Sequence, residues 1–137
     1  MGSSRTVLVV EAEPQLREAM AYGLRRRGYE VQTAGDAAEA EDLLARGLPH
    51  LLVTDMQLPG PSGFQVARLV AERSDGRVPV VMVSANTSPA HRDYALASGV
   101  DVFLARPVSP AELATAAEEL CPLPAPRPAP RPAVAHS

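Results

Sequence analysis

Several polar side chains follow apolar stretches of the sequence, and their types suit the transfer of a phosphoryl group. They are Glu11 and Glu13 after the first stretch, Asp55 at the end of 51–55, Ser84 after 78–83 and Arg106 after 100–104. An aspartate at the end of a strand can attack phosphorus, while a hydroxyl and a cation hold the phosphoryl oxygens. Clustered carboxylates repel one another unless a cation lies among them, and Mg²⁺ is a hard cation that carboxylates bind. These side chains therefore favour phosphoryl chemistry assisted by Mg²⁺.

Five apolar runs are predicted strands, and each is followed by a segment with helical periodicity. The runs are 5–10, 29–34, 51–55, 78–83 and 100–104. Strands that alternate with helices predict a parallel sheet with right-handed crossovers. If the first strand lies between the second and the third, the polar side chains meet at the carboxyl edge of the sheet, where ligands bind in such folds. Taken alone, Asp55 is equally well explained as a residue that caps a turn.

The predicted helices have recognisable ends and apolar faces. Capping patterns start three of them, at Asp36 with Glu39, at Ser88 with Pro89, and at Ser109 with Pro110 and Glu112. The first helix begins at Pro14 and ends at 25–28, where arginines and a glycine are typical of a C-terminus. The residues expected to point inward are Leu16, Ala19, Met20 and Leu24 in the first helix, Phe64, Ala67, Val70 and Ala71 in the third, and Leu113, Ala116, Ala117 and Leu120 in the fifth.

Length and composition predict one folded domain over residues 1–121. The chain has 137 residues, and 46% of them are hydrophobic, which suits a packed core. The net charge of −3 does not favour nucleic-acid binding, and no apolar run approaches the roughly 20 residues of a membrane span. The single Cys121 and the lack of a basic and apolar leader favour the reducing cytoplasm.

A proline-rich tail or linker is predicted over residues 122–137. Proline occupies every second position from 122 to 132, mainly with alanine and arginine between. Such a segment cannot build a core and favours an extended polyproline II conformation. We therefore expect a disordered spacer rather than part of the domain.

Four segments resemble the receiver domain of two-component response regulators. They are VLVVEAEPQLRE, LLVTDMQLPGPSGF, VVMVSA and VFLARPVSPAEL, and the resemblance extends from about Arg5 to Cys121. It implies an α/β, flavodoxin-like (βα)5 fold, with a five-stranded parallel sheet in the order 2-1-3-4-5 and helices on both faces. It also implies a signalling domain rather than an enzyme, which at most catalyses its own phosphorylation and dephosphorylation. The implied partners are a sensor histidine kinase or phosphotransfer protein and a downstream protein target, with a homodimer through the fourth and fifth helices as a further candidate.

The resemblance also implies roles for individual residues. Asp55 would accept the phosphoryl group from the histidine kinase. Glu11, Asp55 and the main-chain carbonyl of Gln57 would bind Mg²⁺, with Glu13 as a further candidate. Ser84 and Arg106 would bind the phosphoryl oxygens, and Ser84 and Phe103 would form the conformational switch. The peptide bond before Pro107 would be cis.

Three residues at two places depart from the pattern of this family. Glu11-Ala12 stands where two adjacent aspartates are usual, and Arg106 stands where lysine is usual. With one carboxylate fewer, Mg²⁺ should bind more weakly, and a planar guanidinium is not equivalent to an ammonium group. The sequence thus leaves open a receiver with weakened or absent Mg²⁺ dependence, a phosphorylation-independent interaction module, and the receiver part of a larger regulator.

Enzymes of the same fold class are disfavoured. A haloacid-dehalogenase-type phosphatase needs a second acid two residues after its nucleophile, where this chain has Gln57. A nucleotide or flavin site needs a glycine-rich loop after the first strand, and the segment 11–14 contains no glycine.

Overall fold

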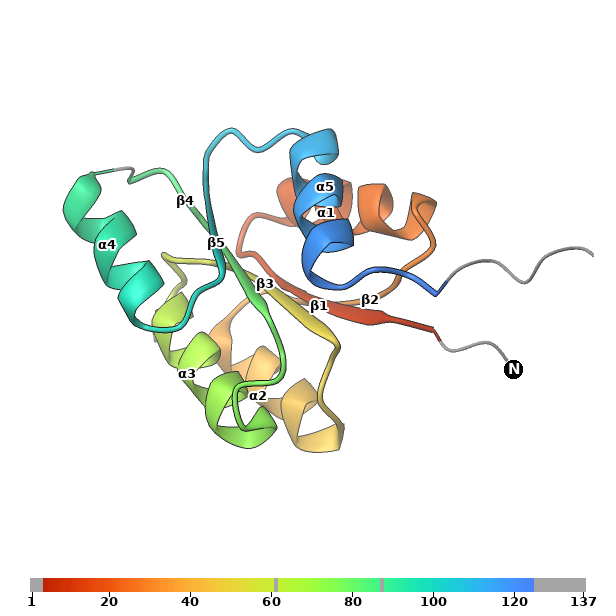
Figure 1. Cartoon of the computed structure of the whole chain (residues 1–137), viewed down its shortest axis with the longest axis horizontal. Helices are drawn as coiled ribbons and strands as arrows, with labels where there is room; N and C mark the ends of the chain where they lie inside the picture. Colours follow the sequence, from red (N-terminus) through yellow and green to blue (C-terminus); the bar gives the residue numbers. More distant parts are fainter. Residues whose placement is uncertain (1–3, 61, 87, 125–137) are drawn as a thin grey trace, which may run out of the picture.

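The computed structural model describes residues 4–60, 62–86 and 88–124, and it contains one five-stranded parallel sheet (Figure 1). The strand order is β2-β1-β3-β4-β5, which confirms the predicted flavodoxin-like fold. The strands are β1 (Thr6–Val10), β2 (Glu30–Ala34), β3 (Leu51–Asp55), β4 (Val80–Ser84) and β5 (Val102–Ala105). The helices are α1 (Pro14–Arg26), α2 (Ala37–Arg46), α3 (Gly63–Ser74), α4 (Pro89–Ala97) and α5 (Pro110–Leu120). In this part of the chain, no helix combines the length and the apolar character needed to cross a membrane.

Helices cover both faces of the sheet. The helices α1 and α5 lie on one face, and α2, α3 and α4 lie on the other (Figure 1). Successive residues of a strand point to opposite faces, so Val7 and Val9 pack toward the first pair of helices and Leu8 and Val10 toward the second group. All four of these side chains are fully buried. The continuous apolar run therefore arises because β1 is covered on both sides.

Polar side chains start the helices much as the sequence predicts. Ser109 and Glu112 form the reciprocal capping box of α5, and Ser88 caps α4. Asp36 accepts a hydrogen bond from the main-chain nitrogen of Glu39 at 2.8 Å. The Glu39 carboxylate binds the nitrogen of Gly35 instead of that of Asp36, so the second half of this predicted capping box is wrong.

The apolar face of α1 differs from the predicted stripe. Leu16 is 42% exposed and Ala19 is exposed, whereas Ala21 and Leu24 are buried. A spacing of four residues advances about 40° around a helix, so Leu16 is rotated about 80° away from Leu24. In α3, the predicted Ala67 and Val70 are buried together with Val66, a position that the prediction missed.

The ends of four strands also differ from the prediction, and β1 and β2 each begin one residue later than predicted. β4 begins at Val80 because Pro79 cannot donate to the ladder, and it extends through Ser84. β5 begins at Val102 rather than at residue 100. The peptide bond between Arg106 and Pro107 is cis, as the resemblance implied. From position 125 on, the predicted tail lies outside the described residues. The domain boundary at residue 121 stays a prediction. Leu123 packs against the part of the core that α1 and α5 cover.

Tyr29 links β2 to the end of α5 and should make stability sensitive to alkaline pH. Its hydroxyl donates to the carbonyl oxygen of Cys121 at 2.7 Å, and the residue is 3% exposed. Burial, and then the neighbouring Cys121 and Glu118, raise the pKa of Tyr29 from 10.0 to about 12. Between these values the unfolded chain has lost the proton and the folded chain retains it, so stability should fall as pH rises, by about 3 kcal/mol in total.

The measurement is denaturant unfolding of the wild-type protein and of Tyr29→Phe between pH 9 and pH 12. The variant should be less stable at pH 9 by about 1 kcal/mol, because the hydrogen bond is lost. The difference should shrink and then reverse as pH rises. Parallel pH profiles of the two proteins would contradict the prediction.

Candidate functional site

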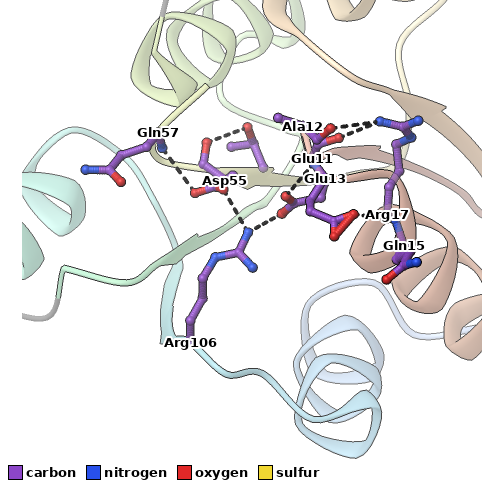
Figure 2. A network of polar contacts seen from close by, with 9 residues as sticks. Glu11, Ala12, Glu13, Gln15, Arg17, Asp55, Gln57 and Arg106 are labelled. Carbon is purple, nitrogen blue, oxygen red and sulfur yellow. Dashed lines mark hydrogen bonds and ion pairs between the residues drawn. The ribbon is translucent and has the colours of Figure 1, made fainter. Parts of the chain in front are cut away.

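Three charged side chains meet at the carboxyl edge of the sheet. Glu11 follows β1, Asp55 ends β3 and Arg106 follows β5. The Nη2 nitrogen of Arg106 donates to Glu11 Oε1 and also to Asp55 Oδ2, the second bond being 2.7 Å long (Figure 2). One nitrogen therefore bridges two carboxylates that come from different strands.

The bridge is largely shielded from water. The side-chain exposures are 3% for Glu11, 12% for Asp55 and 21% for Arg106. Burial lowers the pKa of Arg106, but the hydrogen bond to Glu11 and the charge of Asp55 outweigh this effect, so that the pKa is raised above its usual value. The guanidinium is thus a permanent positive charge between the two acids.

The turn after β3 holds Asp55 in position. Asp55 Oδ1 accepts a hydrogen bond of 3.1 Å from the main-chain nitrogen of Gln57. Gly63, the first residue of α3, donates from its nitrogen to the carbonyl oxygen of Met56 at 2.9 Å. A Cβ atom at Gly63 would lie 1.9 Å from the main-chain oxygen of Asp55. Glycine is therefore required where α3 meets the end of β3.

Arg17 holds the loop after β1 from the other side, and it was not among the predicted site residues. Its Nη1 nitrogen donates to the carbonyl oxygen of Glu11 at 2.9 Å and to that of Ala12 at 3.5 Å (Figure 2). A cation in the first turns of a helix opposes the helix dipole. This unfavourable position is the signal in the sequence that Arg17 has a local partner.

Glu13 takes part in helix capping. Its Oε1 atom accepts a hydrogen bond of 2.7 Å from the nitrogen of Gln15 at the start of α1, and the residue is exposed. Its main-chain nitrogen donates to Glu11 Oε2 at 3.0 Å. The main-chain nitrogen of Glu13 therefore binds Glu11, while the Glu13 carboxylate lies at the N-terminus of α1.

Ser84 lies at the same edge of the sheet, and its hydroxyl makes its hydrogen bond with Asn86 rather than with Asp55. It is fully buried, and its hydroxyl oxygen accepts a hydrogen bond of 2.9 Å from the nitrogen of Asn86. The nitrogen of Arg106 donates to the carbonyl oxygen of Ser84 at 3.0 Å. The main chain of β4 therefore helps to anchor the residue that bridges the two acids.

Phe103 points into the core and is covered by a cation. The residue is 6% exposed, and the guanidinium carbon of Arg92 lies 5.4 Å from the centre of its ring. A cation over an aromatic face is attracted by the electron density of the ring. Arg92 lies on α4, so this contact ties α4 to β5. Arg92 was not among the predicted site residues.

The described residues do not form a site that fits Mg²⁺. The implied carboxylate ligands Glu11 and Asp55 are bridged by Arg106, Glu13 caps α1, and Ala12 supplies no carboxylate. Within residues 4–60, 62–86 and 88–124, no three His, Cys, Asp or Glu side chains are grouped so that they could hold a metal ion. The carbonyl of Gln57 alone is not a metal site. The arrangement is instead that of an aspartate neutralised by an arginine.

Comparison with known proteins identifies close similarity to a signalling family. Residues 7–118 match the family described as the response regulator receiver domain. The chain is 37% identical over 108 residues to the phosphate regulon transcriptional regulatory protein PhoB of Rhizobium meliloti, covering 78% of this chain and 48% of that protein. It is 35% identical over 116 residues to the 14.6 kDa protein in the sodA1 3′ region of Leptolyngbya boryana, covering 84% of this chain and 88% of that protein.

A solved structure shows the same arrangement of strands and helices. The chemotaxis response regulator CheY4 of Vibrio cholerae aligns with a TM-score of 0.79 and 26% identity, covering 86% of this chain and 99% of that chain. The chain spans about half the length of PhoB. The similarity to PhoB therefore covers only about half of that longer protein.

Proposed function

This chain belongs to the response regulator receiver family, and we propose that it accepts a phosphoryl group on Asp55 and signals through contacts with other proteins. The observation that supports this proposal is the ion pair between Asp55 and Arg106 at the carboxyl edge of the sheet. It places the proposed nucleophile beside a cation whose N–H donors suit phosphoryl oxygens.

The proposed step transfers phosphorus from nitrogen to oxygen. A lone pair of an Asp55 carboxylate oxygen attacks the phosphorus atom of a phosphohistidine on a sensor kinase or phosphotransfer protein. The P–O bond forms while the P–N bond breaks, and the imidazole keeps the electron pair and takes up a proton. Arg106 stabilises the charge that develops on the phosphoryl oxygens, because its guanidinium has N–H donors beyond the two that bind the carboxylates.

A change of hydrogen bonds at Ser84 would carry the signal outward. In the unphosphorylated protein the hydroxyl oxygen accepts from Asn86, and we propose that the hydroxyl turns to donate to the phosphoryl group on Asp55. The loop between β4 and α4 would move when the Ser84 hydroxyl turns. This movement would change the contact between Arg92 on α4 and Phe103 on β5. The face formed by α4, β5 and α5 would then change its affinity for a downstream protein.

Other partners stay predictions. PhoB is a transcriptional regulatory protein and MtrA of Mycolicibacterium smegmatis is a DNA-binding response regulator, and this chain covers 46–48% of their lengths. These relatives support the proposal that this sequence acts as the receiver part of a larger regulator. The absence of direct nucleic-acid contacts, the homodimer through α4 and α5, and the cytoplasmic location remain expectations from the sequence.

Phosphorylation of Asp55 can be tested by intact mass spectrometry. Wild-type protein incubated with acetyl phosphate or phosphoramidate should gain one phosphoryl group, and Asp55→Asn should gain none. Asp42→Asn, which removes an exposed aspartate on α2, is the matched control and should react like the wild type. Lack of a mass gain with these donors and with a phosphohistidine protein would contradict the proposal and favour a phosphorylation-independent module.

A further inference from the structure

We infer that Arg106 is the resident cation of this site: its guanidinium fills the role of a divalent metal between Glu11 and Asp55, so that phosphoryl acceptance does not require Mg²⁺. The role in phosphoryl acceptance rests on the function proposed above. The role as resident cation rests only on the geometry of the three side chains.

Arg106 compensates a carboxylate that is buried away from water. Glu11 has a side-chain exposure of 3%, and an ionised carboxylate this far from water needs a permanent partner of opposite charge. Arg106 is that partner, and the same nitrogen reaches Asp55 at 2.7 Å. A metal ion would have to displace this nitrogen from both carboxylates and then leave the guanidinium beside a divalent charge.

The carboxylate oxygens of Glu11 and Asp55 that Arg106 does not bind already have main-chain donors. Glu11 Oε2 accepts from the nitrogen of Glu13 at 3.0 Å, and Asp55 Oδ1 accepts from the nitrogen of Gln57 at 3.1 Å. Arg17 donates to the main-chain oxygen of Glu11 at 2.9 Å. Mg²⁺ takes near-octahedral oxygen ligands, usually one or two carboxylates together with waters, so it would compete with these donors for the Glu11 and Asp55 oxygens.

Arg106 can still bind a phosphoryl group while it bridges the two acids. A guanidinium carries five N–H donors in one plane, and both acids use the same Nη2 atom. Among the residues that the structure describes, Nε and Nη1 of Arg106 have no hydrogen-bond partner. A guanidinium that bridges the acids with Nη2 can therefore present Nε and Nη1 to phosphoryl oxygens as single donors, because both two-pronged edges of the group include Nη2.

Metal binding can be measured without phosphoryl transfer. Thermal unfolding and calorimetric titration with MgCl₂ are compared for the wild type, Arg106→Gln and the double variant Glu11→Gln/Arg106→Gln. The wild type should show no increase in Tm with millimolar Mg²⁺. Arg106→Gln frees both carboxylates, so it should bind Mg²⁺ at least about tenfold more tightly than the wild type and gain several degrees in Tm. The double variant should lose most of this gain.

Arg77→Gln removes an exposed arginine and is the control for a change of net charge alone, so it should behave like the wild type. If Arg106→Gln does not fold, the wild-type titration alone is the test. An increase in the wild-type Tm with millimolar Mg²⁺ would then overturn the inference. A wild-type protein that binds Mg²⁺ as tightly as Arg106→Gln, or that is stabilised by it to the same degree, would overturn the inference.

The phosphorylation assay separates this inference from the proposed function. A phosphoryl gain on Asp55 that is equal in MgCl₂ and in excess chelator supports both. A gain in MgCl₂ alone overturns the metal-independent role of Arg106 and leaves Asp55 as the phosphoacceptor. If Asp55 gains no phosphoryl group in either condition, the proposed function is contradicted. An increase in Tm with Mg²⁺ that occurs in Arg106→Gln and not in the wild type would still support Arg106 as the resident cation.

Discussion

Replacing Gly63 with alanine should lower the free energy of unfolding by about 3 kcal/mol or more and displace the end of β3. The added Cβ atom would lie 1.9 Å from the main-chain oxygen of Asp55 and 2.9 Å from its carbonyl carbon. These are backbone atoms of a central, buried strand, so they cannot move aside as the end of a flexible side chain could. The start of α3 and the end of β3 must therefore separate.

This separation should also affect function, because the moved residue is the proposed phosphoacceptor. We expect Gly63→Ala to lose phosphoryl acceptance together with stability. Gly47→Ala is the matched control, since a Cβ atom at Gly47 meets nothing within 4 Å and its φ of 165° is extended backbone. Its free energy of unfolding should stay within about 0.5 kcal/mol of the wild type. Equal stability of the two variants in denaturant titrations would refute the prediction.

Removing the cation between the two acids should have an effect of similar size. Arg106→Gln leaves Glu11 and Asp55 close together without a positive charge, and the side chain of Glu11 is 97% hidden from water (3% exposed). Breaking a buried ion pair by removing one partner commonly costs 3–5 kcal/mol. Because Arg106 is itself 21% exposed, we expect a loss near the lower limit, about 3 kcal/mol at pH 7 in a buffer without divalent metal ions.

A double-mutant cycle tests the cause of this loss. Glu11→Gln alone removes one side of the pair, and Glu11→Gln/Arg106→Gln removes both. If the cost comes from an uncompensated buried charge, the double variant should be more stable than the sum of the single effects predicts, by about 1 kcal/mol or more. Additive losses in urea unfolding would show that Arg106 stabilises the fold by packing rather than by charge.

Local signals in the sequence were sufficient for most of the fold. The alternation of apolar runs with amphipathic segments predicted five strands and five helices in the observed order. This worked because a strand covered on both faces needs a continuous apolar run, and a helix on its surface needs a one-sided pattern. The prediction failed at Leu16, since a regular spacing of apolar residues does not show which turn of a helix lies over the sheet.

The sequence alone determined which chemical groups this protein can bring to the edge of its sheet: an aspartate after a buried strand, a glutamate instead of an acid pair, and an arginine before a proline. Only the tertiary structure decided that one nitrogen of Arg106 joins Glu11 and Asp55, residues that are 95 and 51 positions away along the chain. The reason is physical. Hydrophobic periodicity sets the type of each element over a few residues, but a hydrogen bond forms or fails within less than an ångström. That distance depends on how three separate strand ends and their side chains pack together, and on Arg17, which holds the loop after β1 in place.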